Sequence, residues 1–142
     1  MISVVQQVSF SAGHRLKDHE GKCRNLHGHN YLVEFHLSAA ELDGVGRVLD
    51  FAEIKQRLGG WIKQYWDHSF ILARDDEEAR RAVSMVDGQR LFIVDNSPTV
   101  ETMSAFLLYS VGPEVLAGTN VVLSKVVMWE TADQYCVAAL DD

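Results

Sequence analysis

The order of the periodic segments in this chain predicts an α+β protein in which helices cover one face of an antiparallel sheet. Segments of alternating hydrophobicity lie near both ends of the chain, and two segments of helical periodicity lie between them. A charged stretch separates the two helical segments. The length of 142 residues is usual for one domain. We therefore expect a single domain over residues 1–142 with the order β-β-α, an insertion, and α-β-β.

The N-terminal third contains two expected strands and a polar loop between them. Residues 3–11 alternate between apolar and polar side chains, and the loop over residues 13–25 is rich in charge and histidine. Residues 27–38 alternate again, which predicts the second strand. Because side chains two residues apart point the same way, one face of this strand carries His27, His29, Tyr31, Val33, Phe35 and Leu37.

Two long helices are expected in the middle of the chain. Asp50 is typical of a helix N-cap, and apolar residues then recur at helical spacing as far as about Trp66. Residues 97–99, Ser-Pro-Thr, supply a cap residue and a proline for the first turn of the second helix. That helix should end near Pro113 or Gly118.

The remaining segments are shorter. Residues 75–84 are charged and favour a short surface helix, and residues 91–94 are an apolar run typical of a short strand. Residues 121–129 and 134–140 are the last two expected strands, with a turn at residues 132–133.

Composition excludes several classes of function. The net charge of −7 argues against general nucleic-acid binding, which requires a basic face. Two cysteines are too few for a disulfide framework, and the N-terminus lacks the pattern of a signal peptide. No apolar run approaches the ~20 residues of a membrane helix. We therefore expect a cytoplasmic protein with neither nucleic acid nor membrane as a partner.

His27-Gly28-His29 is the sharpest chemical feature of the sequence. Two histidines two residues apart on a strand share a face, so both imidazoles can reach one metal ion. His14, at the end of the preceding strand, can supply a third ligand if the two strands are neighbours. Three imidazoles and an open position are typical of a catalytic zinc site.

Two other interpretations of the histidines stay open. Cys23 lies four residues before His27 and could be a fourth ligand, which would close the coordination sphere and make the zinc structural. Alternatively, the histidines are ordinary surface residues of a polar loop.

Two carboxylates, Asp67 and Glu130, are also candidate functional groups. Asp67 can orient the imidazole of His68 for acid–base chemistry, although His68 could equally well only meet the dipole at the end of the first helix. Glu130 stands on an otherwise apolar strand. It is either an exposed alternate position or a buried anchor for ligand N–H groups.

Several motifs, in chain order, resemble those of the 6-pyruvoyl- and 6-carboxy-tetrahydropterin synthase family. They are Phe10-Ser11-Ala12-Gly13-His14-Arg15-Leu16, Cys23-Arg24-Asn25-Leu26-His27-Gly28-His29-Asn30-Tyr31, Asp50-Phe51, Asp67-His68, Pro98-Thr99-Val100-Glu101 and Trp129-Glu130-Thr131. The resemblance covers nearly the whole chain. The stretch between His68 and Pro98 is longer than in the compact bacterial members of the family.

This resemblance implies the tunnelling fold (T-fold), an antiparallel four-stranded sheet with two helices on one face. Three subunits would close a barrel, and two trimers would stack into a homohexamer. By position, the zinc (Zn2+) ligands would be His14, His27 and His29. Cys23 would be the proton-transferring thiol, assisted by Asp67 and His68 of a neighbouring subunit. Glu130 would hold the pterin, with Thr99 beside it.

The implied reaction is the zinc-dependent conversion of 7,8-dihydroneopterin triphosphate to 6-carboxy-5,6,7,8-tetrahydropterin, a lyase step of 7-deazaguanine (queuosine) biosynthesis. The alternative within the family is 6-pyruvoyl-tetrahydropterin synthesis, since the same residues serve both reactions. An alternative of another class is a non-catalytic, zinc-stabilised pterin-binding protein. Arg15, Lys22 and Arg24 are candidate contacts for the triphosphate.

Overall fold

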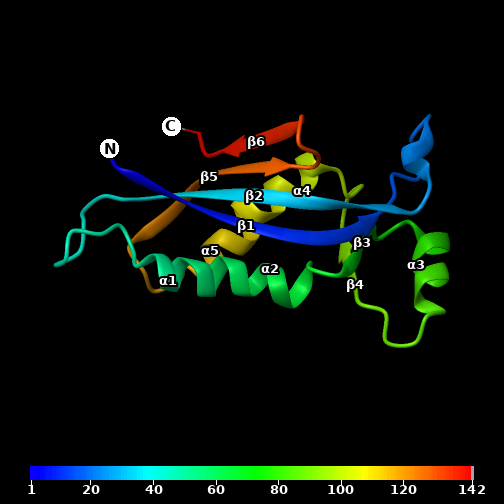
Figure 1. Ribbon diagram of the computed structural model, residues 1–142, viewed down its shortest axis with the longest axis horizontal. Helices are drawn as coiled ribbons and strands as arrows, with labels where there is room; N and C mark the ends of the chain where they lie inside the picture. The colour runs from blue at the N-terminus through cyan, green and yellow to red at the C-terminus, as the bar shows by residue number, and fades with distance from the viewer. Residues whose placement is uncertain (142) are drawn as a thin grey trace.

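The computed structural model describes residues 1–141 and contains one six-stranded sheet with the long helices on one side of it (Figure 1). Strands β1, β2, β5 and β6 are antiparallel neighbours in that order, and β3 and β4 continue the sheet beyond β1 as parallel strands. The strands are β1 (Ser3–His14), β2 (His27–Ala39), β3 (Ser69–Ala73), β4 (Leu91–Val94), β5 (Val121–Trp129) and β6 (Tyr135–Ala139).

The α+β class and the four antiparallel strands are confirmed, and the sheet is wider than expected by two parallel strands. The strand expected at residues 91–94 is β4. The expected element order lacks β3, whose sequence Ser-Phe-Ile-Leu-Ala is largely buried and shows no alternation. Short apolar runs of this kind are typical of parallel strands that are covered on both faces.

Strand β1 continues three residues beyond the expected end at Ser11. It pairs with β2 along its whole length, and the last pair of this ladder joins His14 to His27. The loop between the strands is correspondingly shorter, and residues 22–24 form one turn of 3₁₀ helix within it.

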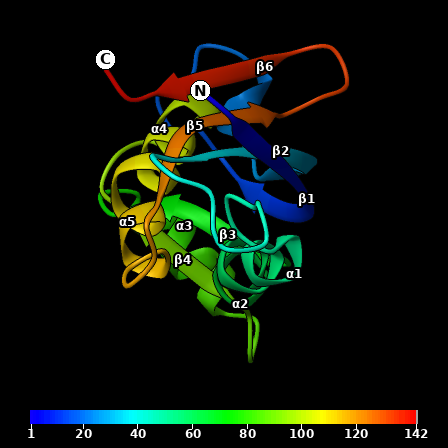
Figure 2. The ribbon, with the colours of Figure 1, turned by 90° about the vertical axis from the view of Figure 1, so that its left-hand side faces the viewer.

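Two long helices lie on the same face of the four antiparallel strands, as expected (Figure 2). Each is an α-helix with a π-helical segment in its middle. The first consists of α1 (Phe51–Ile54), the π segment Lys55–Gly59 and α2 (Gly60–Tyr65), and the second of α4 (Val100–Phe106), the π segment Leu107–Val111 and α5 (Gly112–Val115). The charged insertion forms α3 (Glu77–Ser84), also as expected.

The start of α4 differs in detail from the expectation. Thr99 is the N-cap, and its side chain accepts a hydrogen bond from the backbone N–H of Thr102. Pro98 therefore precedes the helix and does not occupy its first turn. This leaves the carbonyl group of Pro98 free of the helix, at a position where it can serve the functional site.

The hydrophobic core fills the space between the sheet and the two long helices. Trp66 follows the end of α2, is fully buried, and packs against Phe10 of β1 and Phe106 of α4, with ring centroids 5.7 and 6.2 Å away. This packing fixes the end of α2 against β1. Within residues 1–141, no helix is both long and apolar enough to cross a bilayer.

Candidate metal centre

Three histidines meet at one end of the sheet because of the register of β1 and β2. His14 pairs with His27, and Ala12 pairs with His29, so all three imidazoles lie on the face that the helices cover. One nitrogen of each ring lies within 4.8 Å of the others. His14 is buried, while His27 and His29 are half-buried. The structure thus brings together the three predicted ligands.

Hydrogen bonds on the far side of two rings fix their orientation. Nδ1 of His14 donates to the carbonyl oxygen of Pro98 at 2.8 Å, and Nδ1 of His27 donates to that of Asn25 at 2.7 Å. With these tautomers, the two Nε2 atoms carry lone pairs, yet they lie only 3.1 Å apart. Lone pairs at that separation repel unless a cation lies between them. Backbone carbonyls that orient imidazoles in this way are typical of metal-binding histidines.

The third ring also fits a metal ion. Nε2 of His29 is buried and has no hydrogen-bond partner in the described residues; the nearest acid is the Glu130 carboxylate, at 3.5 Å. A buried nitrogen of this kind is costly unless it is satisfied by a ligand. The donor set of three imidazoles therefore fits a divalent transition metal such as zinc.

Electrostatics keep the rings in the form that binds metal. The pKa of His14 is lowered to about 4, mainly by burial; the hydrogen bond to Pro98 opposes this shift, and the neighbouring His27 and His29 add to it. Burial also lowers the pKa of His29, although the charge of Glu130 opposes that shift. Both imidazoles are neutral at pH 7, and neutral imidazole is the ligand form.

Cys23 lies outside this cluster. It sits in the 3₁₀ turn before β2, is half-buried, and accepts a backbone hydrogen bond from Leu16 through its carbonyl oxygen. Among the described residues, the group that can hold a metal contains the three histidines and not this thiol. The arrangement argues against a closed site of one cysteine and three histidines.

Asp67 and His68 occupy the tight turn between α2 and β3. The Asp67 carboxylate accepts hydrogen bonds from the backbone N–H of Ser11 at 3.0 Å and lies 3.0 Å from Nδ1 of His68. The backbone N–H of His68 donates to the carbonyl oxygen of Ser11. The pair is therefore attached to β1, and the imidazole, which is 77% exposed, is held by a carboxylate.

His68 has a backbone φ of +61°, in the left-handed region that costs a residue with a β-carbon about 1–2 kcal/mol. We expect His68→Gly to be at least as stable as the wild type, with a melting temperature up to about 3 °C higher. Thermal unfolding of both proteins at equal zinc content measures this. His36→Gly on β2 is the control and should lower stability, because a strand interior disfavours glycine. A large loss of thermal stability in His68→Gly would show that the backbone at position 68 is not strained.

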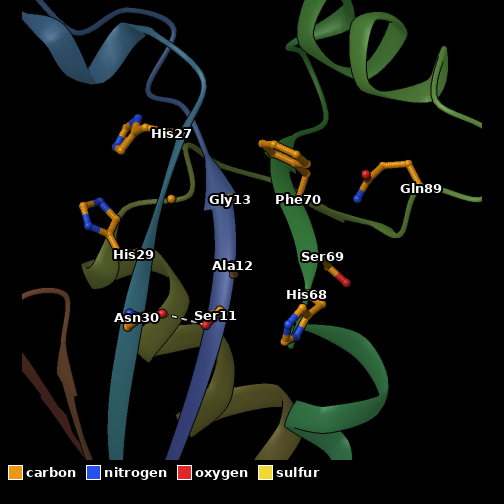
Figure 3. Close-up of a pocket in the computed structure, with 11 residues that line it drawn as sticks. Ser11, Ala12, Gly13, His27, His29, Asn30, His68, Ser69, Phe70 and Gln89 are labelled. Atoms are coloured by element: carbon orange, nitrogen blue, oxygen red, sulfur yellow. Dashed lines mark hydrogen bonds between the residues drawn. The ribbon is translucent and has the colours of Figure 1, made fainter.

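A shallow groove of about 420 Å³ runs across the sheet beside the histidine cluster (Figure 3). His27 and His29 border it on the β2 side, and His68 and Phe70 border it beyond β1. Gln89, from the segment before β4, completes this outer side. The β2 segment that carries His27 and His29 and the turn that carries His68 thus border the same groove in one chain, although the imidazoles of His27 and His29 point away from β1 and His68 (Figure 3). Cys23 is not one of the residues that line this groove.

The remaining predicted residues lie around the cluster. Glu130 follows β5, is 26% exposed and points its carboxylate at His29, so it is a partly buried group beside the site. Thr99 stands next to Pro98, the residue that binds His14. Sequence reasoning misses the Pro98 and Asn25 carbonyls, because a backbone acceptor has no residue type that would reveal it.

Arg15 forms an ion pair with a carboxylate outside the histidine cluster. Its guanidinium binds the Asp76 carboxylate in two places, at 2.7 and 2.5 Å, and this carboxylate is only 2% exposed. The Arg15 guanidinium holds the pKa of Asp76 below its usual value. The pair joins the β1–β2 loop to the start of α3, so Arg15 is not free for a phosphate. Lys22 and Arg24 remain the exposed cations next to Cys23.

Solved structures with the same architecture identify the fold. A protein of Wolinella succinogenes, described as uncharacterized, superposes with a TM-score of 0.81 at 23% identity, covering 99% of this chain and 98% of the other. The 6-pyruvoyl tetrahydropterin synthase of Caenorhabditis elegans gives 0.71 at 24% identity, covering 99% and 96%. The fold is therefore the T-fold of tetrahydropterin synthases.

Sequence comparison then defines the family. The family model described as 6-pyruvoyl tetrahydropterin synthase matches residues 3–140. The 6-carboxy-5,6,7,8-tetrahydropterin synthase of Rickettsia felis is 36% identical over 131 residues, which are 92% of this chain and 95% of that protein. The chain belongs to the 6-pyruvoyl tetrahydropterin synthase family, a family of pterin synthase enzymes.

Proposed function

We propose that this protein is a zinc-dependent 6-carboxy-5,6,7,8-tetrahydropterin synthase acting on 7,8-dihydroneopterin triphosphate. The observation that carries the proposal is the cluster of three imidazoles, one of them with a buried nitrogen that has no partner in the described residues, in a chain 36% identical to a protein of that name. Bound zinc would act as a Lewis acid that lowers the pKa of hydroxyl groups on the substrate side chain.

The chain's own residues would move the protons. Cys23 would transfer a proton at the side-chain carbon next to the pterin ring. An ordinary thiol is only about 3% thiolate at pH 7, so Cys23 needs a base. His68, oriented by Asp67, is the proposed base, and Lys22 and Arg24 beside Cys23 are proposed contacts for the triphosphate.

Product analysis tests the proposal directly. The zinc-loaded protein would be incubated with 7,8-dihydroneopterin triphosphate, and mass spectrometry would identify the product. Release of 6-carboxy-5,6,7,8-tetrahydropterin supports the proposal. Release of 6-pyruvoyl-tetrahydropterin would replace it with the alternative activity of the family, and recovery of unchanged substrate would favour a non-catalytic pterin-binding protein.

His27→Ala should remove most of the zinc, whereas the wild type should hold about one ion per chain. The reason is that two imidazoles are left from a set of three, and neither lies where it could replace the lost one. Metal analysis after dialysis measures the difference. The control is His36→Ala on the same strand. His36 does not belong to the cluster, and its Nε2 lies 3.3 Å from the Glu34 carboxylate. Full zinc retention in His27→Ala would contradict the ligand assignment.

Glu130→Gln should weaken binding of 6-carboxy-5,6,7,8-tetrahydropterin at least tenfold, about 1.4 kcal/mol, without changing zinc content. A carboxylate accepts two charge-assisted hydrogen bonds from ring N–H groups, whereas an amide presents one acceptor and one donor. Calorimetry under anaerobic conditions measures the affinity. The exposed Glu114→Gln on α5 is the control. Equal affinity in the wild type and Glu130→Gln would show that Glu130 does not hold the pterin.

The hexamer also belongs to this proposal. Strand β3 pairs with β1 only at Ala12 and Gly13, so residues 3–11 of β1 have no strand on that side within the described chain. Strand β6 is the last strand at the other edge of the sheet. Open edges of this kind are suited to pairing with another chain. They support closure of a barrel by three copies, with two such trimers forming the hexamer.

A further inference from the structure

Arg90, in the segment between His68 and Pro98, makes an unusual set of contacts for an exposed side chain. It comes directly before β4, and its backbone carbonyl accepts a hydrogen bond from the N–H of Phe70 in β3. Its guanidinium Nη2 donates to the backbone carbonyls of Lys63, at 3.1 Å, and Gln64. Its Nε donates to the hydroxyl oxygen of Ser69 at 3.3 Å.

These acceptors belong to the two ends of one turn. Lys63 and Gln64 lie in the last turn of α2, where backbone carbonyls have no partner within the helix. Ser69 opens β3, and its hydroxyl donates to the carbonyl oxygen of Tyr65 at 2.8 Å. The cationic guanidinium also faces the negative end of the helix dipole. Arg90 thus ties the end of α2 to the start of β3 across residues 66–68.

His68 lies at the centre of this turn, with its backbone in the left-handed region. A residue with a β-carbon stays in such a conformation only where its surroundings hold it there. On one side, the turn is attached to the backbone of Ser11. On the other side, the turn is held by the hydrogen bonds that the Arg90 guanidinium donates to the two carbonyls of α2 and to the hydroxyl of Ser69. Arg90 itself does not line the groove that His68 borders, although its neighbour Gln89 does.

We propose that Arg90 is a positioning residue for His68, holding the turn so that the imidazole keeps its place beside the groove. This inference rests on the proposed function in that His68 is there the proton-transferring base. It assigns a task to the end of the insertion before β4, which neither binds the metal nor contains a proposed catalytic residue.

The kinetic test uses Arg90→Gln in the zinc-loaded full chain. We expect kcat to fall about tenfold or more, because small displacements of a reacting group cost large factors in rate. KM should stay within about threefold of the wild type, since Arg90 does not border the groove. The matched control is Arg74→Gln, which loses an exposed pair with Asp95 in the same segment and should keep wild-type kcat. Wild-type kcat in Arg90→Gln would overturn the proposal.

A double-mutant cycle separates positioning from general weakening of the fold. If Arg90 acts through His68, Arg90→Gln should cause no further loss of activity in a His68→Ala background. An equal loss in both backgrounds would overturn the proposal. Arg90→Lys should keep part of the activity that Arg90→Gln loses. An ammonium group can replace one of the hydrogen bonds of the guanidinium but cannot reach all of its acceptors at once. No recovery with lysine, together with a lowered melting temperature, would point to a merely structural role and count against positioning.

Amide hydrogen exchange distinguishes failure of this inference from failure of the proposed function. The N–H group of His68 donates to the carbonyl oxygen of Ser11 in β1, and that of Ser69 donates to the carbonyl oxygen of Trp66 within the turn. They should exchange at least about tenfold faster in Arg90→Gln and at the wild-type rate in Arg74→Gln. Full activity of His68→Ala would refute the proposed role of His68, and the exchange rates alone would then decide whether Arg90 holds the turn. Unchanged exchange in Arg90→Gln would refute the inference whatever His68 does.

Discussion

Cys23→Ala is expected to lose turnover by about 10²–10⁴-fold while keeping its zinc and its melting temperature. The thiol lies in a 3₁₀ turn outside the histidine cluster, so its removal takes no atom from the metal site. The side chain is only half-buried, and the turn is held by backbone bonds that alanine preserves. Product formation, metal content and thermal unfolding of this one variant measure the three quantities.

The control is the other free cysteine. Cys136 is half-buried on β6, far along the chain from the cluster, and Cys136→Ala should keep full activity. A Cys23→Ala protein that loses zinc affinity and stability together would instead identify the thiol as a fourth ligand, because structural zinc binding contributes to the free energy of folding. That result would make the site closed and the zinc structural.

The histidine cluster could be predicted because it depends on a short-range rule. The two-residue period of a strand fixes which side chains share a face, so His27 and His29 had to point the same way. Placing His14 beside them needed only that consecutive strands pair, which antiparallel strands joined by a loop commonly do. The register that joins His14 to His27 then follows from the hydrophobic pattern of both strands.

Other parts of the site depend on contacts that leave no local pattern. The bond from His14 to the carbonyl of Pro98 spans 84 positions in the sequence, and any residue could supply that carbonyl. Strand β3 is a short apolar run whose type is decided by its neighbours β1 and β4. The left-handed backbone of His68 is also set by tertiary contacts, because histidine, although it tolerates this region better than most residues with a β-carbon, adopts it in only a small minority of positions.

The positions of Cys23 and His68 along the β1–β2 pair bear on whether one chain can complete the catalytic site. The backbone of His68 is bonded at the level of Ser11, whereas Cys23 lies beyond the level of His14 and His27. Three strand residues separate these levels, which is roughly 10 Å at about 3.3 Å per residue. Direct proton transfer requires hydrogen-bond distance. This separation favours a site that takes Cys23 from one subunit and the Asp67–His68 pair from its neighbour.

Mixing two inactive variants should therefore restore activity. In a ring assembled at random from equal amounts of Cys23→Ala and His68→Ala chains, a site is intact when a His68→Ala chain supplies the cysteine and a Cys23→Ala chain supplies the histidine. Each condition holds with probability one half, so about a quarter of wild-type activity should return in a closed cyclic oligomer. The two chains would be unfolded and refolded together, and native mass spectrometry would confirm that mixed oligomers form.

The matched control mixes Cys23→Ala chains with chains that carry both substitutions. Every chain in that mixture lacks the thiol, so no arrangement of subunits completes a site, and activity should stay at background even though the oligomers are equally mixed. Recovery in the first mixture and none in the second can arise only if the thiol and the imidazole come from different chains. Background activity in both would mean that they act within one chain. The substrate would then have to bridge the separation along β1, while the histidine cluster would keep its role in binding the metal.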